Sequence, residues 1–256
     1  MIDLHCHVLA GIDDGPETIE EAVALARAAL AAGIRTVVAT PHVNARTPND
    51  SATIAQLVRA LNERLVAEGV ELDVLPGGEL AMTQIPEIDP GELSRLGLGG
   101  GRWLLVEPPF TTVALGLEGL VQTLHRAGHG VVLAHPERCP ALQRDHSIVR
   151  SLTQDGVLMS ITSGSLVGRF GSTVRRYALE LAHEGLIHNV TSDAHDTTGR
   201  PPGIAAELEQ AGLAPLADWL TQMVPAAILG DEEIPRPPAG AFADRRPRRR
   251  AWHLRR

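Results

Sequence analysis

The sequence predicts a single α/β domain in which parallel strands alternate with helices. Short runs of apolar or β-branched residues alternate along the chain with longer stretches of helical period. Each stretch between two strand candidates can hold a helical crossover, which is the usual connection between parallel strands. With 256 residues the chain can bury a sizeable core, and with only 3% aromatic residues that core must consist mainly of Ala, Val, Leu and Ile.

The first strand is expected where the apolar residues Met1, Ile2 and Leu4 lead into two histidines. Pro16 then favours the start of a helix, and Gly33 favours its end. The expected strands are 2–5, 36–39, 71–75, 103–107, 130–134, 157–161 and 187–191. The expected helices are 17–32, 51–68, 114–127, 141–154, 172–185, 202–211 and 215–229.

Seven such β-α units with short connections favour a parallel barrel, although an open doubly wound sheet produces the same pattern. The phosphate-binding Gly-x-Gly-x-x-Gly of a dinucleotide-binding domain is absent, because the glycine-rich segment 97–101 precedes an expected strand instead of following one. A dinucleotide-binding function is therefore not indicated.

The carboxyl-terminal segment differs from the rest of the chain in charge. Residues 244–256 contain seven arginines and one aspartate, a net charge of +6, whereas the whole chain carries −8. We expect residues 1–233 to form the folded domain and residues 234–256 to be a disordered Pro- and Arg-rich tail. Such a tail could contact an anionic membrane surface or an acidic partner, but a solvated terminus is the simpler interpretation.

Composition also excludes several functions. The acidic body argues against a nucleic-acid-binding surface on the domain. Two cysteines give no disulfide framework, and neither a signal peptide nor a membrane-spanning segment is indicated, so a cytoplasmic protein is expected. All 23 basic residues are arginines, which removes lysine from every candidate mechanism.

Residues suited to metal binding follow six of the seven expected strands. In the opening Asp-Leu-His-Cys-His, the alternation of a strand places His5 and His7 on one face and Cys6 on the other. The remaining candidates near strand ends are Asp13, Asp14, His42, Glu79, Glu107, His135, Asp193 and His195, with Arg138 and Arg200 close by. In a parallel barrel these strand ends meet at one face, where active sites of that architecture are built.

This nitrogen and oxygen donor set suits Mn²⁺, Fe or Zn²⁺ and exceeds what one ion requires. Two or three ions bridged by a carboxylate are therefore expected, with Glu79 as the preferred bridge. Cys6 and Cys139 are expected to be packing residues. The other histidines are expected to be structural because they lie in helices or before strands: His125, His129, His146, His183 and His188.

Taken together, these positions resemble the polymerase-and-histidinol-phosphatase (PHP) family of metal-dependent phosphoesterases. The likeness is closest to its bacterial tyrosine-protein phosphatase branch, the CpsB/YwqE type. It spans roughly residues 1–230 and rests on Ile-Asp-Leu-His-Cys-His, Gly-Ile-Asp-Asp-Gly-Pro, Thr-Pro-His, Gly-Glu, Val-Glu, His-Pro-Glu-Arg, Thr-Ser-Asp-Ala-His and Gly-Arg-Pro-Pro.

The resemblance implies a distorted, TIM-like (β/α)₇ PHP barrel with a trinuclear, manganese-dependent metal centre. By position, the implied ligands are His5, His7, Asp14, His42, Glu79, Glu107, His135, Asp193 and His195. Arg138 and Arg200 fall on the catalytic, phosphate-binding arginines of the family. The implied substrate is phosphotyrosine on a bacterial tyrosine kinase that controls capsule or exopolysaccharide production.

Two other functions remain open from the sequence. One is a phosphatase of the same family acting on a small phosphomonoester such as histidinol phosphate, and the other is a non-catalytic, metal-containing regulator that binds a kinase. Cysteine-based phosphatase chemistry is excluded because neither cysteine has an arginine six residues later. Amidohydrolase sites bridged by a carbamylated lysine are excluded because the chain contains no lysine.

Overall fold

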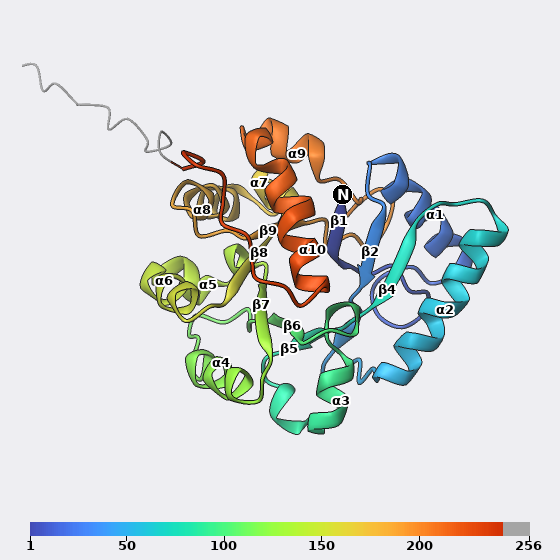
Figure 1. Cartoon of the computed structure of the whole chain (residues 1–256), viewed down its shortest axis with the longest axis horizontal. Helices are drawn as coiled ribbons and strands as arrows, with labels where there is room; N and C mark the ends of the chain where they lie inside the picture. The colour runs from blue at the N-terminus through green and yellow to red at the C-terminus, as the bar shows by residue number, and fades with distance from the viewer. Residues whose placement is uncertain (243–256) are drawn as a thin grey trace, which may run out of the picture.

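The computed structural model describes residues 1–242, which form a parallel barrel surrounded by helices (Figure 1). The strands are β1 (Ile2–Cys6), β2 (Thr36–Ala39), β3 (His42–Val43), β4 (Asp73–Pro76), β5 (Glu79–Ala81), β6 (Trp103–Glu107), β7 (Gly130–Ala134), β8 (Leu158–Thr162) and β9 (Asn189–Thr191). Each of these strands pairs with its neighbours in parallel orientation.

The helices lie mainly on the outside of the strands (Figure 1). The α-helices are α1 (Ile19–Ala31), α2 (Ser51–Ala67), α3 (Pro90–Arg95), α4 (Leu117–Arg126), α5 (Pro140–Arg144), α6 (His146–Gln154), α7 (Ser163–Leu166), α8 (Ser172–His183), α9 (Ala205–Gln210) and α10 (Val224–Leu229). Short 3₁₀ turns are η1 (Ile85–Glu87), η2 (Leu98–Gly100), η3 (Pro136–Arg138) and η4 (Ala214–Leu216), and η5 (Trp219–Met223) is a π-helical segment.

The strands form two sheets because two long strands are interrupted. One sheet has the order β1-β2-β4 and the other the order β3-β5-β6-β7-β8-β9. The strand conformation is interrupted at Thr40-Pro41, between β2 and β3, and at Gly77-Gly78, between β4 and β5. Since β2 pairs with β4 and β3 with β5, these four short strands are two interrupted strands of one barrel wall. The barrel therefore has seven strand positions, as expected.

The barrel closes between its first and last strands through only a few contacts. Cys6 and Ala194 form an isolated parallel bridge. The His7 amide donates to the carbonyl of Ala194 at 2.9 Å, and the Asp193 amide donates to the carbonyl of His5 at 2.9 Å. These bonds join the end of β1 to the segment after β9, so the first and last groups of predicted site residues become neighbours.

The expected elements are confirmed in order, with some differences in detail. The strands expected at 36–39, 103–107 and 130–134 have the observed bounds. The expectation of one helix over 141–154 is wrong, because Asp145 leaves the helical conformation (φ −126°, ψ 91°) and separates α5 from α6. The expected helix 215–229 is also wrong as a single α-helix, because this segment is a succession of 3₁₀, π and α turns.

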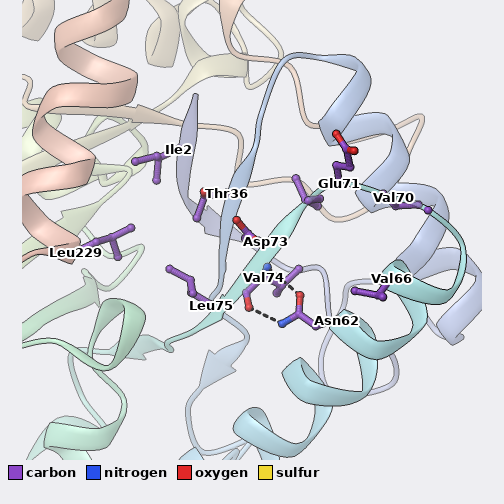
Figure 2. A pocket seen from close by; sticks show the side chains of 12 residues that line it. Ile2, Thr36, Asn62, Val66, Val70, Glu71, Asp73, Val74, Leu75 and Leu229 are labelled. Atoms are coloured by element: carbon purple, nitrogen blue, oxygen red, sulfur yellow. Dashed lines mark hydrogen bonds between the residues drawn. The ribbon is translucent and has the colours of Figure 1, made fainter.

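A cavity of about 830 Å³ lies beside β4, near the first residues of β1 and β2 (Figure 2). Leu75 and Leu229 are among its lining residues. Asn62 of α2 satisfies the free edge of the strand: its side-chain nitrogen donates to the Val74 carbonyl at 2.8 Å, and its side-chain oxygen accepts from the Val74 amide at 3.1 Å. A side-chain amide thus replaces the missing strand partner.

The first part of the expected tail lies against the barrel. The Trp219 indole donates to the Pro235 carbonyl at 2.9 Å, and Phe242 meets the Trp219 ring edge to face. The Arg-rich segment 243–256, for which a membrane or partner contact was considered, lies outside the described residues. Within residues 1–242, no helix is both long and apolar enough to cross a membrane.

Candidate metal centre and arginine pair

The two histidines of the opening motif point into the same site. The Nε2 atoms of His5 and His7 lie 3.2 Å apart, and both side chains are almost fully buried. Cys6 lies between them in the chain, and its thiol contacts the Ala194 carbonyl at 3.6 Å instead. The alternation of the strand therefore places the imidazoles and the thiol as the sequence predicted.

Glu79 and Asp193 complete this group from other parts of the barrel. Glu79 Oε2 lies 3.3 Å from His5 Nε2 and 3.4 Å from His7 Nε2. Asp193 Oδ1 lies 3.5 Å and 3.6 Å from the same two nitrogens. Donor atoms bound to one ion by bonds of about 2.1 Å are separated by roughly 3.0–3.4 Å, so these spacings are close to those of a shared metal site.

Glu79 also contacts two further histidines. Its Oε2 lies 2.9 Å from His42 Nδ1, and its Oε1 lies 2.8 Å from His135 Nε2. One buried carboxylate therefore faces four imidazoles, those of His5, His7, His42 and His135. This is the position required of a bridging ligand, which is the role the sequence suggested for Glu79.

The other predicted residues lie at the two sides of this centre. Asp14 Oδ1 is 3.5 Å from His42 Nε2 and 3.3 Å from His195 Nε2. Glu107 Oε1 is 3.9 Å from His135 Nε2. The potential donors form four overlapping groups, each with its atoms within 4.8 Å of one another: His7-Asp14-His42-His195, His5-His7-Asp193, His5-Glu79-His135 and His42-Glu79-Glu107.

The electrostatics of the site fit bound cations. Burial, together with the neighbouring Glu79 carboxylate, raises the pKa of Glu107 to about 7. Burial alone would lower the pKa of His7, but hydrogen bonds to Asp13 and Glu79 raise it to about 10. The neighbouring carboxylates thus favour positive charge on His7. Because several buried carboxylates share few cationic partners, divalent ions would offset the cost of burying them.

Asp13 belongs to the site, although only its neighbour Asp14 was predicted as a ligand. Its side chain is completely buried, and its Oδ2 lies 2.7 Å from His7 Nδ1 and 3.1 Å from the His42 amide. A carboxylate on the outer nitrogen fixes the ring of a metal-binding histidine and makes its inner nitrogen more basic. The sequence signal was the Asp-Asp pair itself, which does not tell which residue faces inward.

Asp3 is another buried carboxylate beside the site, and sequence reasoning did not single it out. It accepts hydrogen bonds from the amide of Ser192 at 3.1 Å and from the amide of His5 at 3.3 Å. Burial raises the pKa of Asp3 to about 6, although these hydrogen bonds oppose the shift. Asp3 holds the segment that carries Asp193 and His195 against β1.

Arg138 and Arg200 converge on one carboxylate oxygen. An Nη atom of each lies 2.6 Å from Asp193 Oδ2, and Arg200 also places an Nη atom 2.8 Å from His195 Nε2. The other oxygen of Asp193 faces the histidines. Asp193 thus lies between the metal-ligand candidates and the arginine pair, so the two parts of the site are adjacent.

Polar contacts, buried at Glu137 and exposed at Asp196, fix the segments that carry both arginines. The Glu137 carboxylate accepts from the Thr162 amide at 3.0 Å and from the Ser165 hydroxyl at 2.7 Å, which anchors η3 beneath Arg138. The Asp196 carboxylate accepts from the amides of residues 198–200 and shapes the loop before Arg200. Sequence reasoning assigned no role to either acid.

Two site residues adopt left-handed backbone conformations. His135 has φ 33° and Asp193 has φ 51°, and the described residues contain only one other non-glycine residue with positive φ, Asp231. Such conformations are uncommon outside glycine, and here they occur at the carboxyl ends of β7 and β9. They turn the two side chains toward the common centre.

The residues expected to be structural lie outside this site. Both cysteines are free and buried, and the Cys139 thiol contacts the Pro109 carbonyl at 3.4 Å. His188 accepts a hydrogen bond from the Met159 amide at 3.0 Å. His146 lies near Glu180 and Glu184 on the outer helices. The histidines of the site are therefore those that follow the strands.

Sequence comparisons place this arrangement among known proteins. Residues 1–211 match the family model described as capsular polysaccharide synthesis, CpsB/CapC. Over 201 residues the chain is 39% identical to the tyrosine-protein phosphatase YwqE of Bacillus subtilis, with 78% of this chain and 79% of YwqE covered. It is 32% identical over 204 residues to the putative tyrosine-protein phosphatase CapC of Staphylococcus aureus, with 78% and 79% covered.

A solved structure agrees with the sequence comparisons. It comes from work on YwqE of Bacillus subtilis and CpsB of Streptococcus pneumoniae, described as metal-dependent tyrosine phosphatases. The TM-score is 0.82 at 34% sequence identity, and the match covers 92% of this chain and 97% of the other. The similarity therefore extends over nearly the whole described barrel.

Proposed function

The chain belongs to the CpsB/CapC family of capsular polysaccharide synthesis, and we propose that it is a metal-dependent protein-tyrosine phosphatase. The observation that carries this proposal is the position of Asp193. Its Oδ1 faces His5 and His7, while its Oδ2 accepts both arginines. A phosphoryl group bound beside Asp193 would have the proposed metal ligands on one side and the two guanidinium groups on the other.

The proposed ligands are the nine residues that the resemblance implies: His5, His7, Asp14, His42, Glu79, Glu107, His135, Asp193 and His195. Their overlapping groups support two or three divalent ions, with Glu79 as a bridge. The mixed nitrogen and oxygen donors suit Mn²⁺, with Fe or Zn²⁺ as alternatives. Asp13 is proposed to orient His7.

Bound divalent ions would activate water and neutralise charge during in-line attack on phosphorus. Arg138 and Arg200 then bind the phosphoryl oxygens and stabilise the charge that develops on them, because a planar guanidinium pairs with two oxygens at once. The anchored segments beneath both arginines hold them in place before the substrate arrives. A phenolate leaves readily, with a pKa of about 10, so a strong general acid is not essential.

The proposed substrate is phosphotyrosine on a protein, in particular a bacterial tyrosine kinase that controls capsule or exopolysaccharide production. The family description and the names of the relatives support this choice. We further propose that the reaction takes place in the cytoplasm, where such a kinase would expose its phosphorylated segment.

The test compares two substrates with protein that carries its metals. We expect turnover of a phosphotyrosine peptide to exceed turnover of histidinol phosphate by at least about 100-fold in kcat/KM, a difference of roughly 3 kcal/mol. The reverse preference would favour the small-molecule phosphatase. Binding of the kinase without hydrolysis of either substrate, in fully metallated protein, would favour the non-catalytic regulator.

A further inference from the structure

Two of the three phenylalanines in the chain lie beside the arginine pair. The Cζ atom of Arg138 is 5.2 Å from the centre of the Phe110 ring and 4.6 Å from the centre of the Phe170 ring. Arg200 Cζ is 6.0 Å from the Phe170 ring. In a chain with 3% aromatic residues, this grouping indicates a local role for the rings.

The two rings differ in exposure and in their neighbours. Phe170 is partly buried and contacts both arginines, so it orients the guanidinium groups. Phe110 is 49% exposed and stacks on the imidazole of His135, with ring centres 5.5 Å apart and planes at 18°. Phe110 therefore leaves about half of its surface exposed at the edge of the site, while its ring also lies against His135 and Arg138.

The backbone around Phe110 is fixed although its ring is exposed. Pro108 and Pro109 precede it and restrict the chain. The Pro109 carbonyl contacts the Cys139 thiol at 3.4 Å, and the Thr111 carbonyl accepts from the Ala141 amide at 3.1 Å. Both bonds tie the segment to the start of α5, next to Arg138. The position of the ring relative to the arginine is therefore maintained by the fold.

We propose that Phe110 receives the phenyl ring of the substrate and selects aryl over alkyl phosphomonoesters. In phosphotyrosine one oxygen joins the ring to phosphorus, so a phosphoryl group held by Arg138 and Arg200 leaves the substrate ring within stacking distance of Phe110. Stacking of two aromatic rings contributes about 1 kcal/mol beyond the burial of apolar surface. This inference rests on the proposed function and adds the residue that recognises the leaving group.

The experiment measures binding of two phosphonates to metal-loaded protein by calorimetry. Benzylphosphonate carries the ring, and methylphosphonate carries only the anionic group. We expect Phe110→Leu to weaken binding of benzylphosphonate about tenfold and to change binding of methylphosphonate less than twofold. Phe170→Leu is expected to weaken both to a similar extent. Leu115→Ala, which alters an 81% exposed side chain a few residues after Phe110, is expected to change neither.

Equal effects of Phe110→Leu on the two phosphonates, or no effect on either, would overturn the proposal. Hydrolysis of a phosphotyrosine peptide by the unaltered protein is measured in parallel. If that activity is present and Phe110→Leu changes binding of the two phosphonates equally, the role proposed for Phe110 is wrong but the proposed function stands. If the activity is absent, the proposed function fails, while the binding data still decide whether Phe110 recognises an aryl group.

Discussion

The two ends of the barrel hold very different spaces. At the amino-terminal end, the cavity of about 830 Å³ beside β4 is lined largely by aliphatic residues, and Asn62 satisfies the strand edge there (Figure 2). At the carboxyl-terminal end, buried imidazoles and carboxylates face one another at 2.8–3.6 Å. The size of a cavity therefore does not identify the site, whereas converging metal-binding groups do.

The largest effect is expected from removing the negative charge of Glu79, the carboxylate that four histidines contact. Glu79→Gln should remove most of the bound metal and lower phosphatase kcat/KM at least about 10³-fold, because four imidazoles lose their common anionic partner. Elemental analysis and turnover measure the two quantities. Glu87→Gln, which makes the same change at an exposed residue, is the control. Full metal content in Glu79→Gln would contradict the account.

The next effect separates the arginines from the metal ligands. Arg200→Ala should lower kcat/KM about 10²- to 10³-fold without reducing metal content, because only charge stabilisation on the phosphoryl group is lost. Arg46→Ala, on an exposed loop, should leave both quantities unchanged. Loss of metal from Arg200→Ala would instead show that its contacts with Asp193 and His195 serve to hold the ligands.

A smaller effect on metal binding is expected from Asp13, which contacts the proposed ligand His7 but is not itself a proposed ligand. Asp13→Asn should weaken metal affinity about 10- to 100-fold, because His7 loses the carboxylate that orients its ring. Titration against a competing chelator measures this affinity. Asp73→Asn makes the same change beside the opposite cavity and should leave metal affinity unchanged. Equal metal affinities in the two variants would show that Asp13 does not support metal binding.

At the opposite end, only stability should change. Asn62→Ala leaves the amide and carbonyl of Val74 without their partner, which should cost about 1–3 kcal/mol in the free energy of unfolding. Metal content and kcat/KM should remain those of the unaltered protein. Urea unfolding and a phosphatase assay on the same samples test both parts, and a large loss of activity would contradict the separation of the two ends.

Much of the barrel could be predicted because buried parallel strands leave a strong apolar pattern. The strands at 103–107 and 130–134 are of this kind. The interruptions at Thr40-Pro41 and Gly77-Gly78 could not be predicted, since they divide β2 from β3 and β4 from β5 into pieces too short to show a period. The split of the expected helix at Asp145 is a similar local event.

The convergence of the candidate residues could be predicted because parallel strand ends meet at one face, so the polar residues that follow the strands were expected to lie together. Asp13 was among the candidates, but its supporting role and those of Asp3 and Glu137 could not be predicted, for a different reason. Asp13, Asp3 and Glu137 act through hydrogen bonds to distant segments, and no spacing within the sequence shows such contacts. The approach of Phe110 and Phe170 to Arg138 depends in the same way on loops far apart in the chain.

The central claim is that the residues around Glu79 hold the divalent ions on which phosphotyrosine hydrolysis depends. The most direct test is metal analysis of protein purified without chelators, with phosphotyrosine turnover measured before and after EDTA and after return of Mn²⁺. We expect two to three ions per chain, loss of activity with the metal, and recovery on its return. Undiminished turnover in protein shown to be free of metal would contradict the account.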